Sequence, residues 1–263
     1  MAADGDPSQE EYLRTVHDPR LIVSFRAERE GKARAYNRVL AHLTSSPLVF
    51  LVSADVGVDP SVFGHMMAHF HDPRLGVAVP RVQPSNSGTM ATRVARVLWD
   101  LHDVQLGALP SDSQNVHGGE FVAIRGELLT PFPENLINDD AYLCVQAIKR
   151  GFRLRYAREV VVQNEVPRSL RELLRQRRRV NYGHWQLSEL GLRPAILTSM
   201  FTQDLRSAFR ILARSVREYP QDIPYLPALA LEEGFAIVLS HADRHGPTDH
   251  TKWAMVERES PRS

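Results

Sequence analysis

The sequence predicts an α/β protein in which a mostly parallel sheet is flanked by helices, with a helical extension at the C-terminus. Short apolar runs alternate along the chain with segments of helical periodicity, which is typical of sheets built from right-handed crossovers. The run Leu48–Val52 is apolar at every position, as expected for a strand buried on both faces. Beyond Trp185 the strand-like runs stop and the pattern becomes helical.

The first part of the chain is predicted to alternate helices and strands. Ala33 and Tyr36 fall at helical spacing after Gly31, which we take as the start of a helix. The strand Leu48–Val52 delivers Asp55 just beyond its carboxyl end, the place where ligands bind in such sheets. The expected elements are a short helix or loose arm over 6–18, a buried strand over 21–25, a helix over 31–43, a strand over 48–52, a helix over 60–70 and a strand over 75–79.

The second part continues this alternation and then turns helical. Gly118 and Gly119 stand just before a strand, where a ligand or a backbone can approach closely. Ser169 and Glu172 have the spacing of a capping box at a helix start. The expected elements are a helix over 92–106, a strand over 120–124, a helix over 139–150, strands over 152–156 and 160–162, a helix from 169, an amphipathic helix over 196–216 and a last helix over 228–242.

Composition restricts the class of protein. The chain has 263 residues, enough for one large domain or for one domain with a helical appendage. A hydrophobic fraction of 43% is ordinary for a globular protein, and a net charge of +1 does not indicate a nucleic-acid partner. The single cysteine, Cys144, excludes an internal disulfide and favours a reducing, cytoplasmic setting.

No signal peptide or membrane span is visible in the sequence. Residues 1–9 are polar and lack the apolar core of a signal peptide. No apolar run approaches the ~18 residues that cross a bilayer. The basic, amphipathic segment 196–216 either packs on the core or lies on an anionic membrane surface. We therefore expect a cytoplasmic protein and leave open peripheral contact with the inner face of the membrane through the C-terminal helices.

Two adjacent aspartates, Asp139 and Asp140, stand at the predicted start of the helix over 139–150. Carboxylates at a helix start commonly cap the helix and complement its dipole. Adjacent carboxylates on a rigid helix can instead have different chemical roles: one orients a ligand or a metal, and the other accepts a proton. The pair alone leaves both interpretations open.

Five motifs in order carry a more specific resemblance. They are Gly31-Lys32-Ala33-Arg34-Ala35-Tyr36-Asn37, Ser53-Ala54-Asp55, Gly118-Gly119, Asn138-Asp139-Asp140-Ala141-Tyr142-Leu143 and Gln176-Arg177-Arg178-Arg179. Their order and spacing resemble the family 2 glycosyltransferases, especially the synthase-like branch, whose motifs are GKxxAxN, DxD, a glycine-containing acceptor loop, ED or DD followed by xxL, and QxxRW. The resemblance covers about Leu21 to Trp185. It implies an inverting enzyme with the GT-A (Rossmann-like) fold that moves a sugar from a nucleotide-diphosphate sugar to an acceptor hydroxyl.

The resemblance also implies roles for the carboxylates. Asp140 takes the place of the general base that removes the proton of the acceptor hydroxyl, and Asp139 helps to shape the acceptor site. Asp55 corresponds to the last residue of DxD and contacts Mg²⁺ or Mn²⁺, hard cations that prefer carboxylate oxygen. Such a cation, together with basic side chains, neutralises the diphosphate leaving group.

The remaining motif residues are assigned to the two substrates. The residues expected to bind the nucleotide-sugar or its diphosphate are Lys32, Ser53, Asp55, Gln176 and Arg179. Gly118 and Gly119 are expected to bind the acceptor, which is either a saccharide or lipid-linked.

Several neighbouring residues are expected to have structural roles. Asn37 should hydrogen-bond backbone within the fold rather than a ligand. Arg177 and Arg178 should form a solvated or membrane-facing surface. Tyr182 and Trp185 either stack on a sugar or pack as core, and we favour the core.

Three departures from the family pattern matter. Ser53 stands where the first aspartate of DxD is usual, and Val180 replaces the tryptophan of QxxRW. Family members carry a βαβ segment of roughly 80–100 residues, two or three βα units, ahead of the GKxxAxN helix. Here about twenty residues precede Leu21. We therefore expect an N-terminally truncated fold that binds nucleotide-sugar poorly and has an exposed strand edge, which favours self-association or a partner.

The predicted organisation is a catalytic domain over 1–185 and a helical region over 186–263. An alternative function is a catalytically impaired binding or partner module with the same fold. Binding of RNA through the helix that carries Arg168 to Arg179 is less favoured, because interleaved exposed aromatic residues and a basic overall charge are absent.

Overall fold

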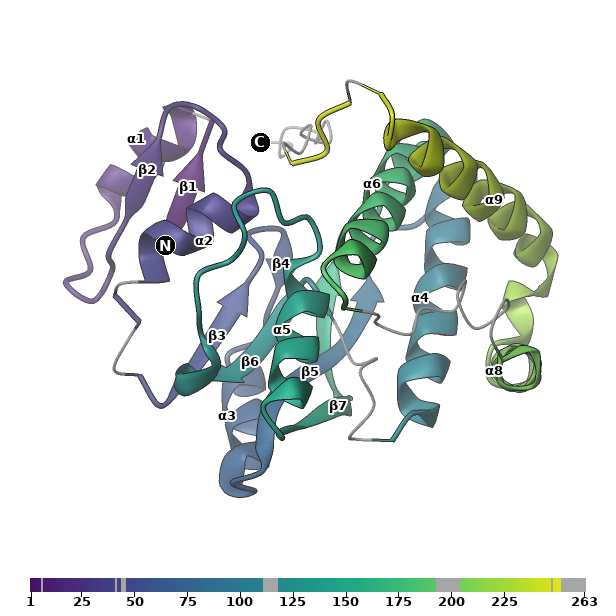
Figure 1. Cartoon of the computed structure of the whole chain (residues 1–263), viewed down its shortest axis with the longest axis horizontal. Helices are drawn as coiled ribbons and strands as arrows, with labels where there is room; N and C mark the ends of the chain where they lie inside the picture. The colour runs from purple at the N-terminus through teal and green to yellow at the C-terminus, as the bar shows by residue number, and fades with distance from the viewer. Residues whose placement is uncertain are drawn as a thin grey trace.

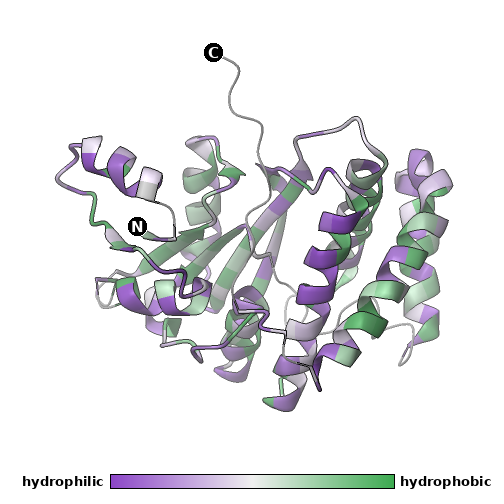
Figure 2. Ribbon diagram, turned by 90° about the horizontal axis from the view of Figure 1, so that it is seen from above, coloured by the Kyte–Doolittle hydropathy of each residue, from purple (hydrophilic) through white to green (hydrophobic). Residues whose placement is uncertain are grey.

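The computed structural model describes residues 1–5, 7–40, 42–43, 46–110, 118–192, 204–246 and 248–251. A five-stranded sheet lies between helices, and the C-terminal helices gather at one side of it (Figure 1). Apolar residues concentrate in the strands of this sheet (Figure 2). The predicted α/β class with a helical C-terminal extension is confirmed.

The central sheet is mixed. Its strands, in spatial order, are β3 (Leu48–Val52), β6 (Phe121–Arg125), β5 (Leu75–Pro84), β7 (Arg153–Asn164) and β4 (Val56–Gly57). Three of them, β3, β5 and β7, run in one direction, but β6 runs antiparallel between β3 and β5, and β4 runs antiparallel to β7. Among the described strands of this sheet, β5 and β7 therefore form the one parallel pairing. The expectation of mostly parallel pairing needs this correction, because an apolar run indicates a strand but not the direction of its neighbour.

Alternating side chains of β5 supply both halves of the core. Val77 and Val79 point to the face covered by α2 (Lys32–Leu40) and α5 (Asp139–Lys149), where Leu143 packs on them. Ala78 points to the opposite face, which α3 (Ser61–Ala68) covers. This period of two is what a strand buried on both faces requires.

The strand β3 lies at an edge of the described sheet and pairs with β6 on one side. Val49 is buried, whereas Val52 is 42% exposed, so the expectation that this strand is buried on both faces is wrong. An edge strand offers unpaired backbone groups to another chain. The exposed edge that the sequence predicted is thus present, and association through it stays a prediction.

The N-terminal residues form a separate two-stranded parallel sheet of β1 (Ala2–Asp4) and β2 (Ser24–Arg26), with α1 (Pro7–Thr15) between them. Ile22 is 52% exposed, so the expectation of a buried strand over 21–25 is wrong. The physical reason is that β2 pairs with β1 instead of joining the central sheet.

The helix α2 returns the chain to the core. Tyr36 stacks on Phe132 with ring centroids 4.0 Å apart. The Asn37 amide nitrogen donates to the Phe132 carbonyl oxygen at 2.9 Å, and its amide oxygen accepts from the Phe132 N–H at 2.8 Å. The predicted backbone role of Asn37 is confirmed.

A layer of helices lies beside the sheet (Figure 1). It contains α4 (Met90–Ala108), α6 (Leu170–Glu189), α8 (Leu205–Glu218) and α9 (Leu226–Asp243). The predicted capping box starts α6, because Ser169 Oγ accepts from the Glu172 N–H and Glu172 Oε2 accepts from the Ser169 N–H. The predicted domain boundary at 185 falls inside α6.

Ion pairs join α6 to α9. Arg177 binds Glu233, and Arg178 binds Asp243. The expectation that Arg177 and Arg178 form a solvated or membrane-facing surface is wrong, because both guanidinium groups bind carboxylates of the last helix. A periodic arginine run shows that a face is charged but not what covers it.

The residues of α8 that belong to the predicted amphipathic segment pack on the protein. Ala208 and Ile211 are buried against Val104 of α4. The earlier residues of that segment, 196–203, lie outside the described residues.

By length and composition alone, the stretch Pro220–Asp243 is long and apolar enough to cross a membrane. The sequence does not show this stretch as one uninterrupted apolar run, because Glu232 and Glu233 interrupt its apolar residues. Only 17% of the apolar window is buried. One side of α9 packs on α6, and the other exposes Leu231, Phe235 and Val238.

Candidate active site

All nine predicted site residues line one cleft of about 1650 Å³ between the sheet and the C-terminal helices. They are Lys32, Ser53, Asp55, Gly118, Gly119, Asp139, Asp140, Gln176 and Arg179. Residues far apart in the sequence thus line the same cleft.

Gly31 and Lys32 bring α2 to the cleft. Gly31 has a φ of +92°, and a Cβ there would lie 2.7 Å from the carbonyl oxygen of Thr251, so glycine suits both the conformation and the space. The Lys32 Nζ lies 2.9 Å from Asp139 Oδ2 and donates to the Gly119 carbonyl oxygen at 3.1 Å. Burial opposes the charge of Lys32, but Asp139 and Asp140 outweigh it and raise the pKa of the ammonium.

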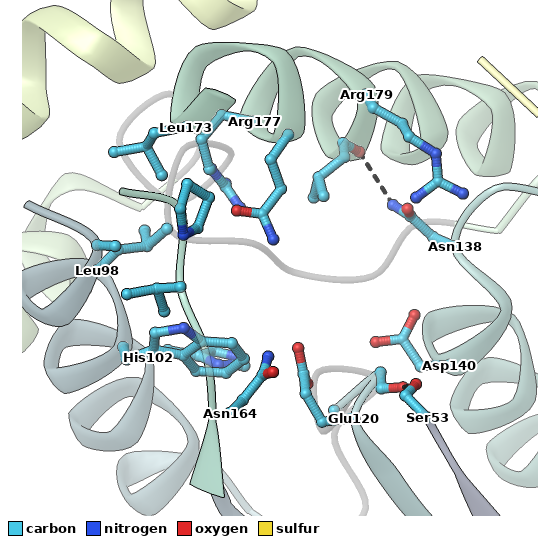
Figure 3. A pocket seen from close by; sticks show the side chains of 18 of the residues that line it. Ser53, Leu98, His102, Glu120, Asn138, Asp140, Asn164, Leu173, Arg177 and Arg179 are labelled. Carbon is cyan, nitrogen blue, oxygen red and sulfur yellow. Dashed lines mark hydrogen bonds between the residues drawn. The ribbon is translucent and has the colours of Figure 1, made fainter. Parts of the chain in front are cut away.

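The two aspartates open α5 with different surroundings. Asp139 is 8% exposed and paired with Lys32. Burial and Asp140 raise the pKa of Asp139, against the lowering effect of Lys32. The side chain of Asp140 points into the cleft (Figure 3). Because the Asp139 carboxylate binds an ammonium from another helix, a simple capping interpretation does not describe the pair.

The preceding residue, Asn138, fixes the start of α5 against α6. Its side chain makes no cap hydrogen bond and donates to the Val180 carbonyl oxygen at 3.0 Å (Figure 3). A Cβ on Gly183 would lie 2.5 Å from Asn138 Oδ1, so glycine permits this close approach. Val180, which replaces the family tryptophan, contributes its backbone here.

Glu120 is a cleft residue that the sequence analysis missed. Figure 3 shows its carboxylate and that of Asp140 facing one another across the cavity. Burial and the charge of Asp140, with a smaller contribution from Asp55 and against Lys32, raise the pKa of Glu120 to about 7. Its Oε2 is buried with no hydrogen-bond partner among the described residues. Because β6 runs antiparallel to β3, the start of β6 lies beside the carboxyl end of β3. Placing Glu120 in the cleft therefore requires the direction of β6, which the sequence does not give.

The glycine loop brings the backbone close to Asp140. A Cβ on Gly119 would lie 3.5 Å from Asp140 Oδ2. The Gly119 carbonyl oxygen accepts from the Ser53 hydroxyl at 3.0 Å as well as from Lys32. The Ser53 N–H donates to the Glu120 carbonyl oxygen at 2.9 Å. Ser53 therefore anchors this loop.

Asp55 is the candidate metal ligand. Its side chain is exposed at the cleft, and its charge acts on Glu120. Among the described residues, no group of three His, Cys, Asp or Glu side chains could hold a metal ion. Mg²⁺ is commonly held by one or two carboxylates while substrate phosphates and water complete its octahedron. Asp55 fits a cation shared with a diphosphate.

The fifth motif places Gln176 and Arg179 one turn apart on α6, and both line the cleft. The Arg179 Nε donates to the His250 carbonyl oxygen at 2.9 Å. Burial lowers the pKa of Arg179, against Asp139 and Asp140, but an arginine stays protonated at neutral pH. Its guanidinium therefore adds a second cation beside the carboxylates.

Tyr182 and Trp185 do not line the cleft. Their rings meet edge to face at 5.4 Å, and the Tyr182 ring lies 4.6 Å from that of His250. The guanidinium of Arg244 stacks 4.2 Å above the Trp185 ring. The contacts with His250 and Arg244 join both rings to the C-terminal segment.

The chain matches the family model described as "Glycosyltransferase like family 2" over residues 11–183. Among solved structures, the mannosyltransferase PcManGT from Pyrobaculum calidifontis, in complex with GDP-Man and Mn²⁺, has a TM-score of 0.53 and 19% identity over 93% of this chain and 64% of that chain. A mycobacterial protein has a TM-score of 0.38 and 22% identity over 66% of this chain and 59% of that one. A search of curated proteins found no match.

The mannosyltransferase likeness shows a shared fold, so the predicted GT-A-like architecture is confirmed. The family match covers well over half of the chain and includes all nine predicted cleft residues. This chain belongs to the family 2-like glycosyltransferases.

Proposed function

We propose that this chain transfers a sugar from a nucleotide-diphosphate sugar to an acceptor hydroxyl with inversion, and that Asp140 is the general base. The observation that carries the proposal is that the two adjacent carboxylates have different surroundings. Asp139 forms an ion pair with Lys32, and Asp140 faces Glu120 across the cleft. Different surroundings for neighbouring acids are the physical condition for different acid–base roles.

In the proposed step, Asp140 accepts the proton of the acceptor hydroxyl while the hydroxyl oxygen attacks the anomeric carbon. The bond between that carbon and the diphosphate oxygen breaks, and its electron pair leaves with the nucleoside diphosphate. Attack opposite the leaving group inverts the configuration. Lys32 and Arg179 place positive charge in the same cleft, where it offsets the charge of the leaving diphosphate.

We assign Asp55 as the residue that would hold Mg²⁺ or Mn²⁺ together with the donor diphosphate. A divalent cation bound there neutralises charge on the departing diphosphate. The exposed position of Asp55 in the cleft supports this assignment. The similar mannosyltransferase was solved with GDP-Man and Mn²⁺, which supports a nucleotide-sugar and a divalent cation as the ligands to test first.

Ser53 favours a second candidate function, a binding or partner module without turnover. Its hydroxyl donates to the Gly119 carbonyl oxygen, so it stabilises a loop at the position where the family has a carboxylate. A chain that lacks this carboxylate would keep the fold and bind saccharide or a partner without transferring sugar.

One experiment separates the two. The chain is incubated with GDP- and UDP-hexoses, Mg²⁺ or Mn²⁺, and saccharide and alkyl glycoside acceptors, and release of nucleoside diphosphate is followed. Proton NMR of the product gives the anomeric configuration. The proposal expects metal-dependent release and an inverted product, both abolished by chelation. Saccharide binding without release from any donor supports the module, and a product of retained configuration contradicts the proposed step.

A further inference from the structure

The cleft extends well beyond the carboxylates. Its volume of about 1650 Å³ exceeds the roughly 300–1000 Å³ of small-molecule sites. One end holds the charged residues around Asp140. The other end, between α4, α6, α8 and α9, is lined by a set of aliphatic side chains that we name the apolar arm: Leu98, Leu101, Leu173, Leu212, Leu229 and Ile237. Of these, Leu101, Leu173 and Leu229 also belong to the hydrophobic core between the helices and are at most 6% exposed, whereas Ile237 is 42% exposed.

The two ends belong to one cavity. Figure 3 shows Asp140 and Glu120 on one side, Leu98 and Leu173 on the other, and Asn164 between them. Among the described residues, Glu120 Oε2 and Asn164 Oδ1 are buried without hydrogen-bond partners. Buried polar atoms normally have partners, so these two indicate where a polar part of a ligand binds, next to the arm.

Charge does not oppose an apolar ligand in the arm. Glu233 borders the cavity, but Arg177 binds its carboxylate with two hydrogen bonds, and the pair has no net charge. A hydrocarbon chain would therefore meet aliphatic side chains and a neutralised pair rather than an isolated buried charge.

The arm continues to the molecular surface along α9. Ala230, Gly234 and Ile237 line the cleft, and the neighbouring Leu231 and Phe235 are 65% and 62% exposed. An exposed stripe of this kind marks a route for an apolar ligand or contact with lipid. The stripe and part of the arm therefore lie on the same helix.

We propose that the apolar arm binds the hydrocarbon chain of the acceptor, so that the hydroxyl that reacts at Asp140 is carried at the head of a long aliphatic chain. This inference rests on the proposed transfer at Asp140. It restricts the proposed class of acceptor from saccharides in general to molecules that carry the reacting hydroxyl on a lipid chain. Since burial of one methylene tightens binding roughly fourfold, affinity should rise steeply with chain length until the arm is full.

The test measures KM for ethyl, octyl and dodecyl glucosides below their micelle concentrations. The variant Ala230→Trp fills the arm at an exposed helix position, and Gly234→Leu adds a side chain where a Cβ meets nothing within 4 Å. Ala213→Trp is the matched control, because Ala213 is exposed on α8 and does not line the cleft. KM should fall as the alkyl chain lengthens. The ratio of KM for ethyl glucoside to KM for dodecyl glucoside should be at least tenfold smaller in Ala230→Trp and Gly234→Leu than in the unaltered chain, and unchanged in Ala213→Trp.

A second readout does not need turnover. Binding of the fluorescent fatty acid cis-parinaric acid is measured for the unaltered chain, Ala230→Trp and Ala213→Trp. The inference expects saturable binding that is unchanged in Ala213→Trp and weakened at least tenfold in Ala230→Trp. This binding pattern without sugar transfer would support hydrocarbon binding in the apolar arm and contradict the proposed function. Transfer with no dependence on chain length, or binding that Ala230→Trp leaves intact, would overturn the inference and leave the transferase proposal standing.

Discussion

The Lys32 ammonium lies 2.9 Å from Asp139 Oδ2, and this ion pair joins the first residue of α2 to the first residue of α5. It pairs Asp139 with a cation, while the side chain of the adjacent Asp140 points into the cleft. Two helix starts that are distant in the sequence thereby define the charged end of the site.

Lys32→Met removes the cation and leaves the Asp139 carboxylate buried without its ion-pair partner. We expect a loss of about 1–2 kcal/mol in the free energy of unfolding, since the lysine is itself partly exposed. Urea unfolding at neutral pH measures this loss. Lys32→Arg, which keeps the charge, should recover most of it, and equal losses in both variants would show that the charge is not what stabilises the pair.

Glu120→Gln tests the raised pKa of about 7. A carboxyl group whose pKa is higher in the folded than in the unfolded state stabilises the fold fully below its unfolded pKa, and this contribution is lost as the pH rises through about 7. The amide cannot titrate. Between pH ~5 and ~8 the variant should therefore gain about 1–3 kcal/mol in unfolding free energy relative to the unaltered chain.

The exposed Glu127→Gln is the control for this pH dependence and should show no such gain. Urea unfolding curves at both pH values supply the comparison. A difference between unaltered chain and Glu120→Gln that is independent of pH would contradict the raised pKa.

Asp243 holds the end of the described chain in place. It is 5% exposed, binds Arg178, and lies 2.8 Å from His250 Nε2. Asp243→Asn should cost about 2–3 kcal/mol, less than a fully buried pair because Arg178 is partly exposed. Thermal unfolding measures the loss, with the exposed Glu189→Gln as control.

A pH series adds a second check on Asp243. Although burial opposes its charge, hydrogen bonds from Arg178 and His250 outweigh burial and lower its pKa. A lowered pKa gives stability that is present above the unfolded pKa of Asp and is lost as the pH falls through the folded value. The destabilisation by Asp243→Asn should thus shrink in acid, and a constant difference would contradict this account.

The exposed stripe on α9 predicts membrane contact, and we propose that the protein works at the cytoplasmic face of a membrane. Phe235 and Val238 are 62% and 66% exposed. The double variant Phe235→Asp, Val238→Asp should reduce co-flotation with phosphatidylglycerol-containing vesicles several-fold, because it removes apolar area from the contact. Ile22→Asp, at an apolar residue that is 52% exposed on the N-terminal segment, should leave it unchanged. Flotation that is absent in the unaltered chain would contradict the proposal.

Local patterns predicted most of the described elements, and the resemblance to the family 2 glycosyltransferases predicted nine residues that meet in the cleft. The apolar run of β3 places Asp55 beside the sheet, and Gly31 marks the start of α2 at Lys32. These features depend on spacing and on the conformation of single residues, both of which are local. The order of the five motifs, which resembles that of the family 2 glycosyltransferases, then brought Lys32, Asp140 and Arg179 together as one candidate site.

What the sequence missed depends on contacts between distant elements. Glu120 became a cleft residue because β6 runs antiparallel to β3. Arg177 and Arg178 bind Glu233 and Asp243 because α9 packs on α6. Neither strand direction nor helix pairing is encoded in the local period of the chain.

The most direct test of the proposed function compares Asp140→Asn with the exposed-carboxylate control Glu134→Gln. Donor Kd is measured by calorimetry, and kcat is measured with the donor and acceptor that give the fastest release of nucleoside diphosphate. Loss of a general base should reduce kcat by about 10²–10⁴-fold while donor Kd stays within about threefold. The control should match the unaltered chain. A kcat for Asp140→Asn within about threefold of the unaltered chain would contradict the assignment of Asp140 as the base.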